Sequence, residues 1–202
     1  MNNDIPKIYK GKNIGLYFGS FNPVHIGHMA IANYMTEFTE IDQLWFVVTP
    51  QSPHKTKHGL LNDYDRLDLV KRAVAGDERF QVCDIEFYLP KPSYTVDTLA
   101  YLSDRNPTLN FKILIGSDNL KNFHKWKNYE VIINNYGLIV YPRPGYKNTL
   151  YKNHLNIIEA DAPRMDISSS FIRNAIRSGK DIRHFLPYNI REYMDQKGFY
   201  RK

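Results

Sequence analysis

The stretch that most constrains the fold of this 202-residue chain runs from Ile14 to Met29 and reads IGLYFGSFNPVHIGHM. It begins with an apolar run, Ile14 to Phe18, which is typical of a buried strand. Glycine and proline between positions 19 and 23 then stop the strand, and helix-forming residues resume near Gly27. Strand, tight turn and helix form the phosphate-binding corner of a βαβ unit, because a helix N-terminus presents unpaired N–H groups and partial positive charge.

Two histidines, His25 and His28, stand at this corner and can share one face of the expected helix. Such a pair could hold a metal ion, although no third ligand follows nearby, or it could be two ordinary surface histidines. The stretch resembles the G-x-F-x-P-x-H-x-G-H signature of the nucleotidyltransferase superfamily, which favours a functional site. Many members of that superfamily have Asp where this chain has Asn22. A neutral side chain there argues against a carboxylate ligand for Mg²⁺ at this point.

A net charge of +6 and a pI near 9.2 fit either nucleic-acid binding or small phosphorylated substrates. The basic residues are dispersed, so we expect small anions and no nucleic acid. Cys83 is the single cysteine, which excludes an internal disulfide and is more typical of an unreactive core residue than of a nucleophile. No stretch approaches the roughly 20 apolar residues of a membrane helix, and residues 1–12 lack a signal-peptide core. These features predict a cytoplasmic protein without membrane contact.

Apolar patterns and turn residues predict strands that alternate with helices along the whole chain. The strands are expected at 14–18, 43–48, 80–87, 110–115, 137–141 and 154–159, and the main helices from about 27, then at 63–75, 93–103, 129–134, 169–178 and 187–197. This order predicts a single domain over residues 1–202 with an α/β, Rossmann-like, doubly wound fold. Its mostly parallel sheet would have helices on both faces and a small C-terminal helical part. Ligands in such folds bind beyond the carboxyl ends of the strands.

A second candidate phosphate site lies in the segment ISSSFIR, from Ile167 to Arg173. Serines at a helix start commonly cap the helix, and capping alone would explain one of them. Arg173 lies four residues after Ser169, on the same helix face, so hydroxyl, N–H and guanidinium groups together could bind a polyphosphate. The segment is similar to the I-S-S-x-x-I-R element of the same superfamily.

Further stretches resemble one family in particular, the bacterial nicotinate-nucleotide adenylyltransferases. They are PQSPHK at 50–55, PSYTVDTL at 92–99, GSD at 116–118 followed by Trp126, and YPRPG at 141–145. The resemblance implies transfer of the adenylyl group of ATP to nicotinate mononucleotide, giving deamido-NAD and pyrophosphate in NAD biosynthesis. It also implies Mg²⁺ carried mainly by the ATP phosphates, with no dedicated metal ligand from the protein. Whether the chain forms a homo-oligomer stays open.

Site residues follow from the resemblance only at matching positions. The implied catalytic residues are His25, His28 and Arg173. The implied ATP-binding residues are Gly19, Ser20, Phe21, His25, His28, Gly116, Asp118, Ser168, Ser169 and Arg173. The implied mononucleotide-binding residues are Asn22, Lys55, Thr95, Trp126 and Arg143.

Within these sets, Thr95 and Trp126 would hold the pyridine ring. Thr95 would contact the ring carboxylate through its backbone and hydroxyl, and Trp126 would stack on the ring, unless its indole is only a core aromatic. Lys55 would meet the mononucleotide phosphate, although a solvated loop lysine is the commoner case. Asp118 would orient a ribose or a phosphate-linked group, and helix N-capping is the competing account. Some relatives have an aromatic residue where this chain has Lys127, a cation that could favour a carboxylate over an amide.

The mononucleotide phosphate would attack the α-phosphorus directly, without a covalent intermediate or a general base. Three alternatives stay open at this stage. The acceptor could be nicotinamide mononucleotide, the donor could be CTP as in a cytidylyltransferase, or the chain could be a non-catalytic nucleotide sensor or RNA-binding protein.

Overall fold

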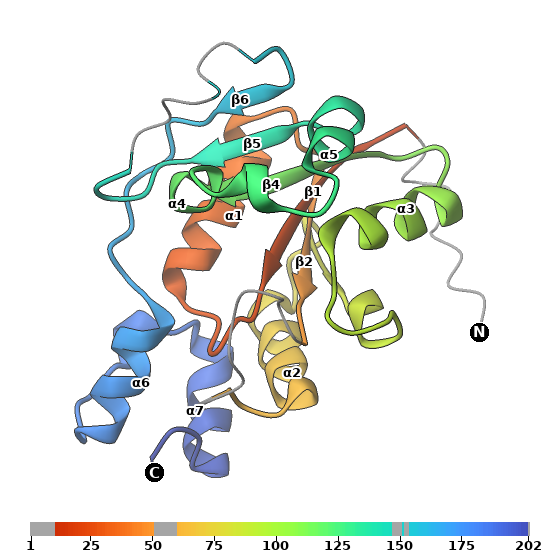
Figure 1. Cartoon of the computed structure of the whole chain (residues 1–202). Coiled ribbons are helices and arrows are strands. Elements are labelled where there is room, and N and C mark those ends of the chain that lie inside the picture. Colours follow the sequence, from red (N-terminus) through yellow and green to blue (C-terminus); the bar gives the residue numbers. More distant parts are fainter. Residues whose placement is uncertain (1–10, 51–59, 147–150, 152–153, 202) are drawn as a thin grey trace.

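The computed structural model describes residues 11–50, 60–146, 151 and 154–201. Six strands form one parallel sheet in the order β3-β2-β1-β4-β5-β6 (Figure 1). The strands are β1 (Asn13–Gly19), β2 (Gln43–Val48), β3 (Phe80–Cys83), β4 (Asn110–Gly116), β5 (Leu138–Tyr141) and β6 (Ile157–Glu159). The predicted Rossmann-like, doubly wound sheet is therefore confirmed, with every strand pair parallel.

Helices connect the strands from β1 to β5, and helices cover both faces of the sheet (Figure 1). They are α1 (Ile26–Phe38), α2 (Asp63–Val74), α3 (Thr95–Arg105), α4 (Ser117–Leu120), α5 (Tyr129–Asn135), α6 (Ser169–Arg177) and α7 (Tyr188–Lys197), with 3₁₀ turns η2 (Ile85–Phe87), η3 (Phe123–Lys125) and η4 (Arg183–Phe185). Among the described residues none of these helices is long and apolar enough to cross a membrane.

The core consists of two apolar clusters, one on each face of the sheet, and strand β2 shows why. Its six residues are all buried, so its sequence is a continuous apolar run rather than an alternating one. Phe46 faces the cluster under α1, α2 and the C-terminal helices, whereas Trp45 and Val47 face the cluster under α3 and α5. Two buried faces thus dictate the composition of the central strands.

The C-terminal helical part, made of α6, η4 and α7, packs beside α2 rather than on the sheet itself (Figure 1). One contact between them is the guanidinium of Arg72, which lies 4.0 Å from the centroid of the Tyr193 ring. This part carries the second predicted phosphate segment to the carboxyl edge of the sheet.

The strand predicted at 80–87 was half wrong. It ends at Cys83, and residues 85–87 turn into a 3₁₀ helix in which the Phe87 N–H donates to the Asp84 carbonyl at 2.9 Å. The alternation of polar and apolar residues continues past Cys83 and places Glu86 on the solvent face. In the structure Glu86 points inward and is buried, so the pattern assigned it to the wrong face. Burial raises the pKa of the Cys83 thiol to about 12, so it stays protonated at neutral pH.

Strand order reverses between β1 and β4, since the chain moves outward from β1 to β2 and β3 and then returns to β4 on the other side. At such a switch point the loops after the two central strands diverge and leave a crevice beyond their carboxyl ends. The predicted phosphate-binding corner follows β1, and the GSD stretch follows β4. The topology therefore places both at the crevice.

Candidate active site

The corner after β1 is a tight turn that depends on small and unusual backbone positions. Phe21 is buried and adopts a positive φ of 44°, which non-glycine residues rarely do. Its ring lies so close to Gly19 that a Cβ at Gly19 would come within 2.8 Å of it. Gly19 therefore cannot carry a side chain without moving Phe21, and the turn delivers the chain to the start of α1.

His25 is the N-cap residue of α1 and lies almost completely buried, with 3% of its surface exposed. A Cβ at Gly27 would lie 3.0 Å from its Nδ1, so glycine at position 27 makes room for the ring. Burial, and secondarily the positive charge of Arg143, lower the pKa of His25 to about 3. His25 is therefore neutral at physiological pH.

The His28 ring packs against the His25 ring, with centroids 3.7 Å apart and ring planes tilted by 34°. Its Nδ1 accepts a hydrogen bond from the backbone N–H of His25 at 3.1 Å. In a neutral imidazole the proton must then sit on Nε2, because Nδ1 is the acceptor. The corner thus fixes the tautomer of His28 so that Nε2 is a donor, which suits a residue predicted to contact phosphate.

The second predicted segment meets the first corner directly. The Ser169 hydroxyl donates to the Pro23 carbonyl at 2.9 Å, and Nη1 of Arg173 donates to the Asn22 carbonyl at 2.8 Å. These bonds join residues 146 and 151 positions apart in the sequence. Two candidate phosphate-binding segments are therefore held together as one site.

Capping accounts for one of the serines, as expected. The hydroxyl of Ser168 accepts from the backbone N–H of Phe171 at 3.2 Å, the geometry of an N-cap. The Ser170 hydroxyl accepts instead from Nη2 of Arg173 at 3.1 Å, so it orients the guanidinium. The three serines thus have three different partners.

The side chain of Asn22 is enclosed by other parts of the protein and is not open to solvent. Its side chain is 2% exposed, and its Oδ1 accepts from the backbone N–H of Leu61 at 3.1 Å and from the Tyr200 hydroxyl at 2.7 Å. It does not line the cavity described below. The position of Asn22 therefore lends no support to its predicted contact with the mononucleotide, and ties the corner to the C-terminal part instead.

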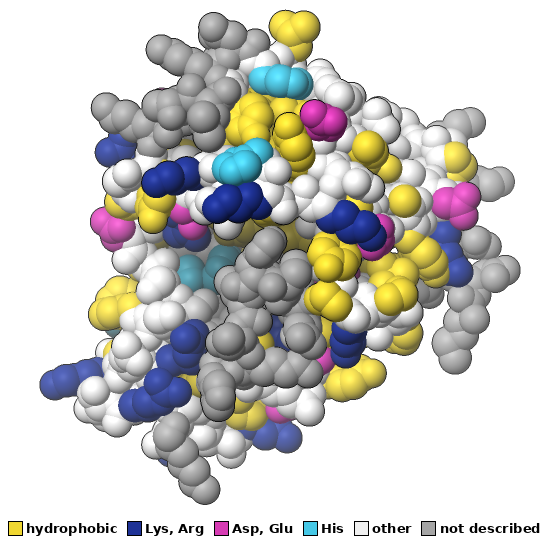
Figure 2. Space-filling view, in the orientation of Figure 1, with side chains coloured by type: hydrophobic (Ala, Val, Ile, Leu, Met, Phe, Trp, Pro, Cys, Tyr) yellow, Lys and Arg dark blue, Asp and Glu magenta, His cyan; other side chains and the backbone are white. Residues whose placement is uncertain are grey.

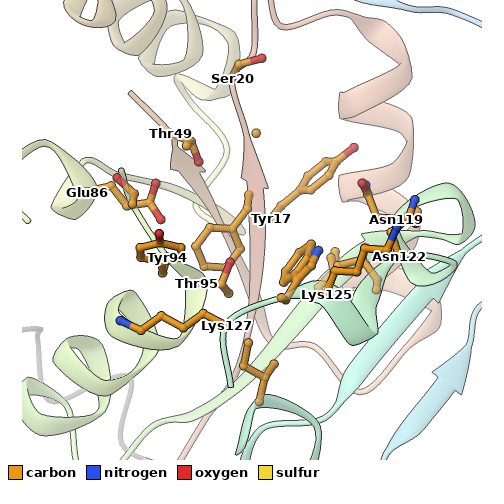
Figure 3. A pocket seen from close by; sticks show the side chains of 18 of the residues that line it. Tyr17, Ser20, Thr49, Glu86, Tyr94, Thr95, Asn119, Asn122, Lys125 and Lys127 are labelled. Carbon is orange, nitrogen blue, oxygen red and sulfur yellow. The ribbon is translucent and has the colours of Figure 1, made fainter. Parts of the chain in front are cut away.

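A cavity of about 460 Å³ opens next to the first corner, at the carboxyl edge of β1, β2 and β4. Five predicted site residues line it: Gly19, Ser20, Thr95, Gly116 and Trp126. In Figure 3 the side chains of Thr49, Tyr94 and Thr95 lie on one side and those of Asn119, Asn122 and Lys125 on the other. Figure 2 shows Lys and Arg side chains around a hollow on this face whose floor is partly hydrophobic. A flat apolar ring with an anionic group would fit such a cavity.

Trp126 is half-buried at the cavity wall, and the centroid of its ring lies 5.4 Å from that of Phe123. Thr95 is the first residue of α3. Lys127, further along the same wall, forms an ion pair with Asp97 at 2.9 Å and lies 4.8 Å from the centroid of the Tyr94 ring. The ammonium group of Lys127 is therefore paired with the Asp97 carboxylate on α3.

Asp118 and Arg143 do not line the cavity. Nε of Arg143 lies 3.9 Å from Oδ1 of Asp118, and the Arg143 charge acts on His25. The structure therefore groups Arg143 with the first corner, and its predicted contact with the mononucleotide stays a prediction. Asp118 is the second residue of α4 and not its N-cap, so the capping account is wrong. Lys55 lies outside the described residues.

Arg66 is a residue that sequence reasoning missed. Its side chain is fully buried, and Nη1 donates to the carbonyls of Ser20 at 2.6 Å and Thr49 at 2.9 Å. Nη2 pairs with Asp63 at 2.7 Å. Arg66 therefore fastens the turn after β1 to the end of β2, where the corner and the cavity meet. Its position in the apolar register of α2, beside Leu67 and Val70, was the available signal.

The fold, the paired histidines and the ISSSFIR segment define an α/β nucleotidyltransferase. The family model described as cytidylyltransferase-like matches residues 16–175. The chain is 46% identical over 187 residues to a probable nicotinate-nucleotide adenylyltransferase of Cytophaga hutchinsonii, covering 93% of this chain and 97% of that one. It is 49% identical over 191 residues to the protein of the same name from Flavobacterium johnsoniae, covering 94% and 99%. The chain belongs to the nicotinate-nucleotide adenylyltransferase family.

The fold is also shared with a solved structure. Nicotinic acid mononucleotide adenylyltransferase of Plasmodium falciparum, complexed with NaAD, superposes with a TM-score of 0.76. The alignment covers 94% of this chain and 98% of that one at 20% identity. At that identity the likeness supports the architecture of the sheet and its helices.

Proposed function

We propose that this protein transfers the adenylyl group of ATP to nicotinate mononucleotide, producing deamido-NAD and pyrophosphate. The observation that carries the proposal is the junction of the two phosphate-binding segments beside a cavity lined by Thr95 and Trp126. One side of such a site suits a triphosphate, and the other suits a pyridine ring. Membership of the nicotinate-nucleotide adenylyltransferase family supports the same reaction.

In this reaction an oxygen of the mononucleotide phosphate forms a bond to the α-phosphorus of ATP. The bond from the α-phosphorus to the oxygen that bridges to the β-phosphorus breaks, and pyrophosphate leaves with the electron pair. The attacking phosphate is already anionic, so no general base is required, and catalysis depends on positioning and charge stabilisation. Nε2 of His28 would donate a hydrogen bond to the phosphates as negative charge moves toward the leaving group.

Arg173 and Ser169 would hold the β- and γ-phosphates. A guanidinium has five N–H groups, and the contacts with the Asn22 carbonyl and Ser170 engage two of them. Those contacts orient Arg173 before ATP arrives. Neutral His25 would add hydrogen bonding to the corner without adding charge.

We also propose Mg²⁺ as the cofactor, carried by the phosphates of ATP and by water. Among the described residues, no group of three or more His, Cys, Asp or Glu side chains is arranged to hold a metal ion. Asn22 is neutral and its Oδ1 is engaged by Leu61 and Tyr200. Mg²⁺ commonly keeps its waters and binds through substrate phosphates. When bound it would neutralise charge on the phosphates.

The substrates we propose are small anions, and this fits a cytoplasmic location without a nucleic-acid partner, as the sequence predicts. The test is pyrophosphate release from ATP with nicotinate mononucleotide and with nicotinamide mononucleotide, each with and without Mg²⁺. We expect the highest kcat/KM for ATP with the nicotinate substrate and a loss of turnover on chelation. A clear preference for the amide, or for CTP over ATP, would contradict the proposal. Tighter binding of RNA than of ATP, without pyrophosphate release, would contradict it as well.

A further inference from the structure

The segment that follows α7 holds one buried aromatic residue in an unusual backbone conformation. Helix α7 ends at Gly198, whose φ of 62° turns the chain back, and the N–H of Phe199 donates to the Met194 carbonyl at 3.1 Å. Tyr200 then adopts a φ of 64°, in the left-handed region that bulky residues rarely enter, although its side chain is buried. A conformation of this kind persists only when the surrounding contacts impose it, so the contacts of Tyr200 indicate its role.

The hydroxyl of Tyr200 reaches the first corner. It donates to Oδ1 of Asn22 at 2.7 Å, and the two residues are 178 positions apart in the sequence. Burial raises the pKa of Tyr200, and the nearby charges of Arg173 and Arg66 offset that rise only in part. The hydroxyl therefore keeps its proton and acts as a donor. Because both side chains are buried, water does not compete for this bond.

Asn22 connects the Tyr200 hydroxyl with Arg173. Its Oδ1 accepts from Tyr200 and from the backbone N–H of Leu61, while its backbone carbonyl accepts from Nη1 of Arg173 at 2.8 Å. The two donors to the side chain fix the orientation of the whole residue, and with it the direction of the carbonyl. The guanidinium of Arg173 is thus aimed by a residue whose side chain is held from the segment after α7.

Tyr193 shows what a tyrosine with a docking role does in the same part of the protein. It lies on α7, and its hydroxyl donates to the carboxylate of Asp68 on α2. This contact joins α7 to α2 and does not involve the first corner. Two tyrosine hydroxyls therefore fasten the C-terminal helical part, one to a neighbouring helix and the other to the predicted phosphate site.

We propose that Tyr200 is a positioning residue for the phosphate side of the active site. Its hydroxyl holds Asn22 so that the Asn22 carbonyl keeps the Arg173 guanidinium directed at the β- and γ-phosphates of ATP. This inference rests on the proposed function, because it adds a residue to the groups that hold ATP there. Tyr200 acts through Asn22 and Arg173 and touches neither substrate.

The experiment is steady-state kinetics with ATP and nicotinate mononucleotide each varied, for the wild type, Tyr200→Phe and Tyr193→Phe. Phenylalanine keeps the ring and removes only the hydroxyl, and loss of one hydrogen bond corresponds to a factor of about three to ten. We expect Tyr200→Phe to lower kcat/KM for ATP by that factor and to leave the KM for nicotinate mononucleotide unchanged. Tyr193→Phe is the matched control, which should lower thermal stability and leave both values unchanged. Equal kinetic losses in the two variants would overturn the proposal.

A double-mutant cycle tests whether Tyr200 acts through Arg173. Calorimetric binding of ATP is compared in Arg173→Ala with and without Tyr200→Phe. If the hydroxyl acts by orienting the guanidinium, its removal should cause no further loss of affinity once the guanidinium is absent. A loss as large as in the wild-type background would overturn the proposal.

Asn22→Ala keeps the proposal testable if Tyr200→Phe fails to fold, because it removes the acceptor end of the same bond. It should also lower kcat/KM for ATP and leave the KM for nicotinate mononucleotide unchanged. A loss confined to the mononucleotide would overturn the proposal and support the predicted contact of Asn22 with that substrate.

Binding and turnover separate the positioning role from the proposed reaction. If the wild-type protein releases pyrophosphate but Tyr200→Phe keeps its kcat/KM for ATP, the positioning role fails and the proposed function stands. If the wild-type protein releases no pyrophosphate but binds ATP more tightly than Tyr200→Phe, and only while Arg173 is present, the proposed reaction fails and the positioning role stands. A wild-type protein that binds no ATP would overturn both.

Discussion

The joined phosphate segments and the cavity lie at the same edge of the sheet, but their polar groups are held in different ways. In the joined segments, Ser169 and Arg173 bond to the backbone carbonyls of Pro23 and Asn22, so their geometry is set by the protein itself. In the cavity wall, Glu86 Oε2 and Ser93 Oγ are buried without a partner in the described part of the chain. Preorganised donors suit the stabilisation of charge that develops during reaction. Unpaired buried groups suit the selection of one ligand over another.

Arg66 should affect both regions, because it bonds to Ser20 on one side and to Thr49 on the other. Arg66→Met leaves these carbonyls and Asp63 without their buried partner, and we expect a loss of about 3–5 kcal/mol in the free energy of unfolding. Denaturant unfolding measures it. Arg201 pairs with Asp195 at the surface, and Arg201→Met should cost less than about 1 kcal/mol. Equal losses in the two variants would show that Arg66 is not the link between the regions.

His28 tests the chemistry of the phosphate corner. His28→Ala removes the Nε2 donor, and we expect kcat to fall by about 10²–10³ while the KM for ATP changes far less. Steady-state kinetics with both substrates varied gives this split. His184 is an exposed histidine in η4, and His184→Ala should keep wild-type turnover. Near-normal kcat in His28→Ala would remove the histidine from the mechanism.

Trp126 tests the cavity, where we expect a change in KM rather than in kcat. Loss of a stacking aromatic costs about 1–3 kcal/mol per stacked ring, so Trp126→Ala should raise the KM for nicotinate mononucleotide with a much smaller change in kcat. Trp126→Phe keeps a stacking surface and should recover most of the affinity. Trp126→Ala could instead lower kcat as His28→Ala does. It would then be wrong to assign catalysis to the joined segments and substrate selection to the cavity.

His25 gives a pH dependence of stability. Its pKa is about 3 in the folded protein and 6.5 in the reference state. Between these values the unfolded chain binds a proton that the folded protein does not, so acidification below pH 6.5 favours unfolding. The slope reaches about 1.4 kcal/mol per pH unit.

Thermal or denaturant unfolding from pH 7 to pH 4 measures this dependence. His25→Asn removes the titrating group and should flatten the curve relative to the wild type. Identical slopes in the two proteins would mean that His25 is solvated rather than buried in the corner.

The predicted elements match closely where one physical signal dominates. The run QLWFVV of β2 is buried on both faces, so hydrophobicity alone defines Gln43–Val48. The predicted end of β3 failed because Glu86, a charged residue, is buried. The sequence does not show that the Glu86 side chain points inward, because the hydrogen bond that holds it there is donated by Thr98 on α3. Asn22 and Arg143 illustrate the same limit, since their partners come from segments far away in the sequence.

The sequence alone determined the order of strands and helices, the family and the two segments that are predicted to bind phosphate. These depend on local patterns: apolar runs, glycine and proline at turns, and short spacings within one helix turn. Only the tertiary structure decided that Ser169 and Arg173 bond to the first corner, that Arg66 fastens corner to cavity, and that Glu86 is buried with an oxygen unpaired. Each of these facts depends on which distant residue lies opposite, and on how much water is excluded between them, which no local pattern encodes.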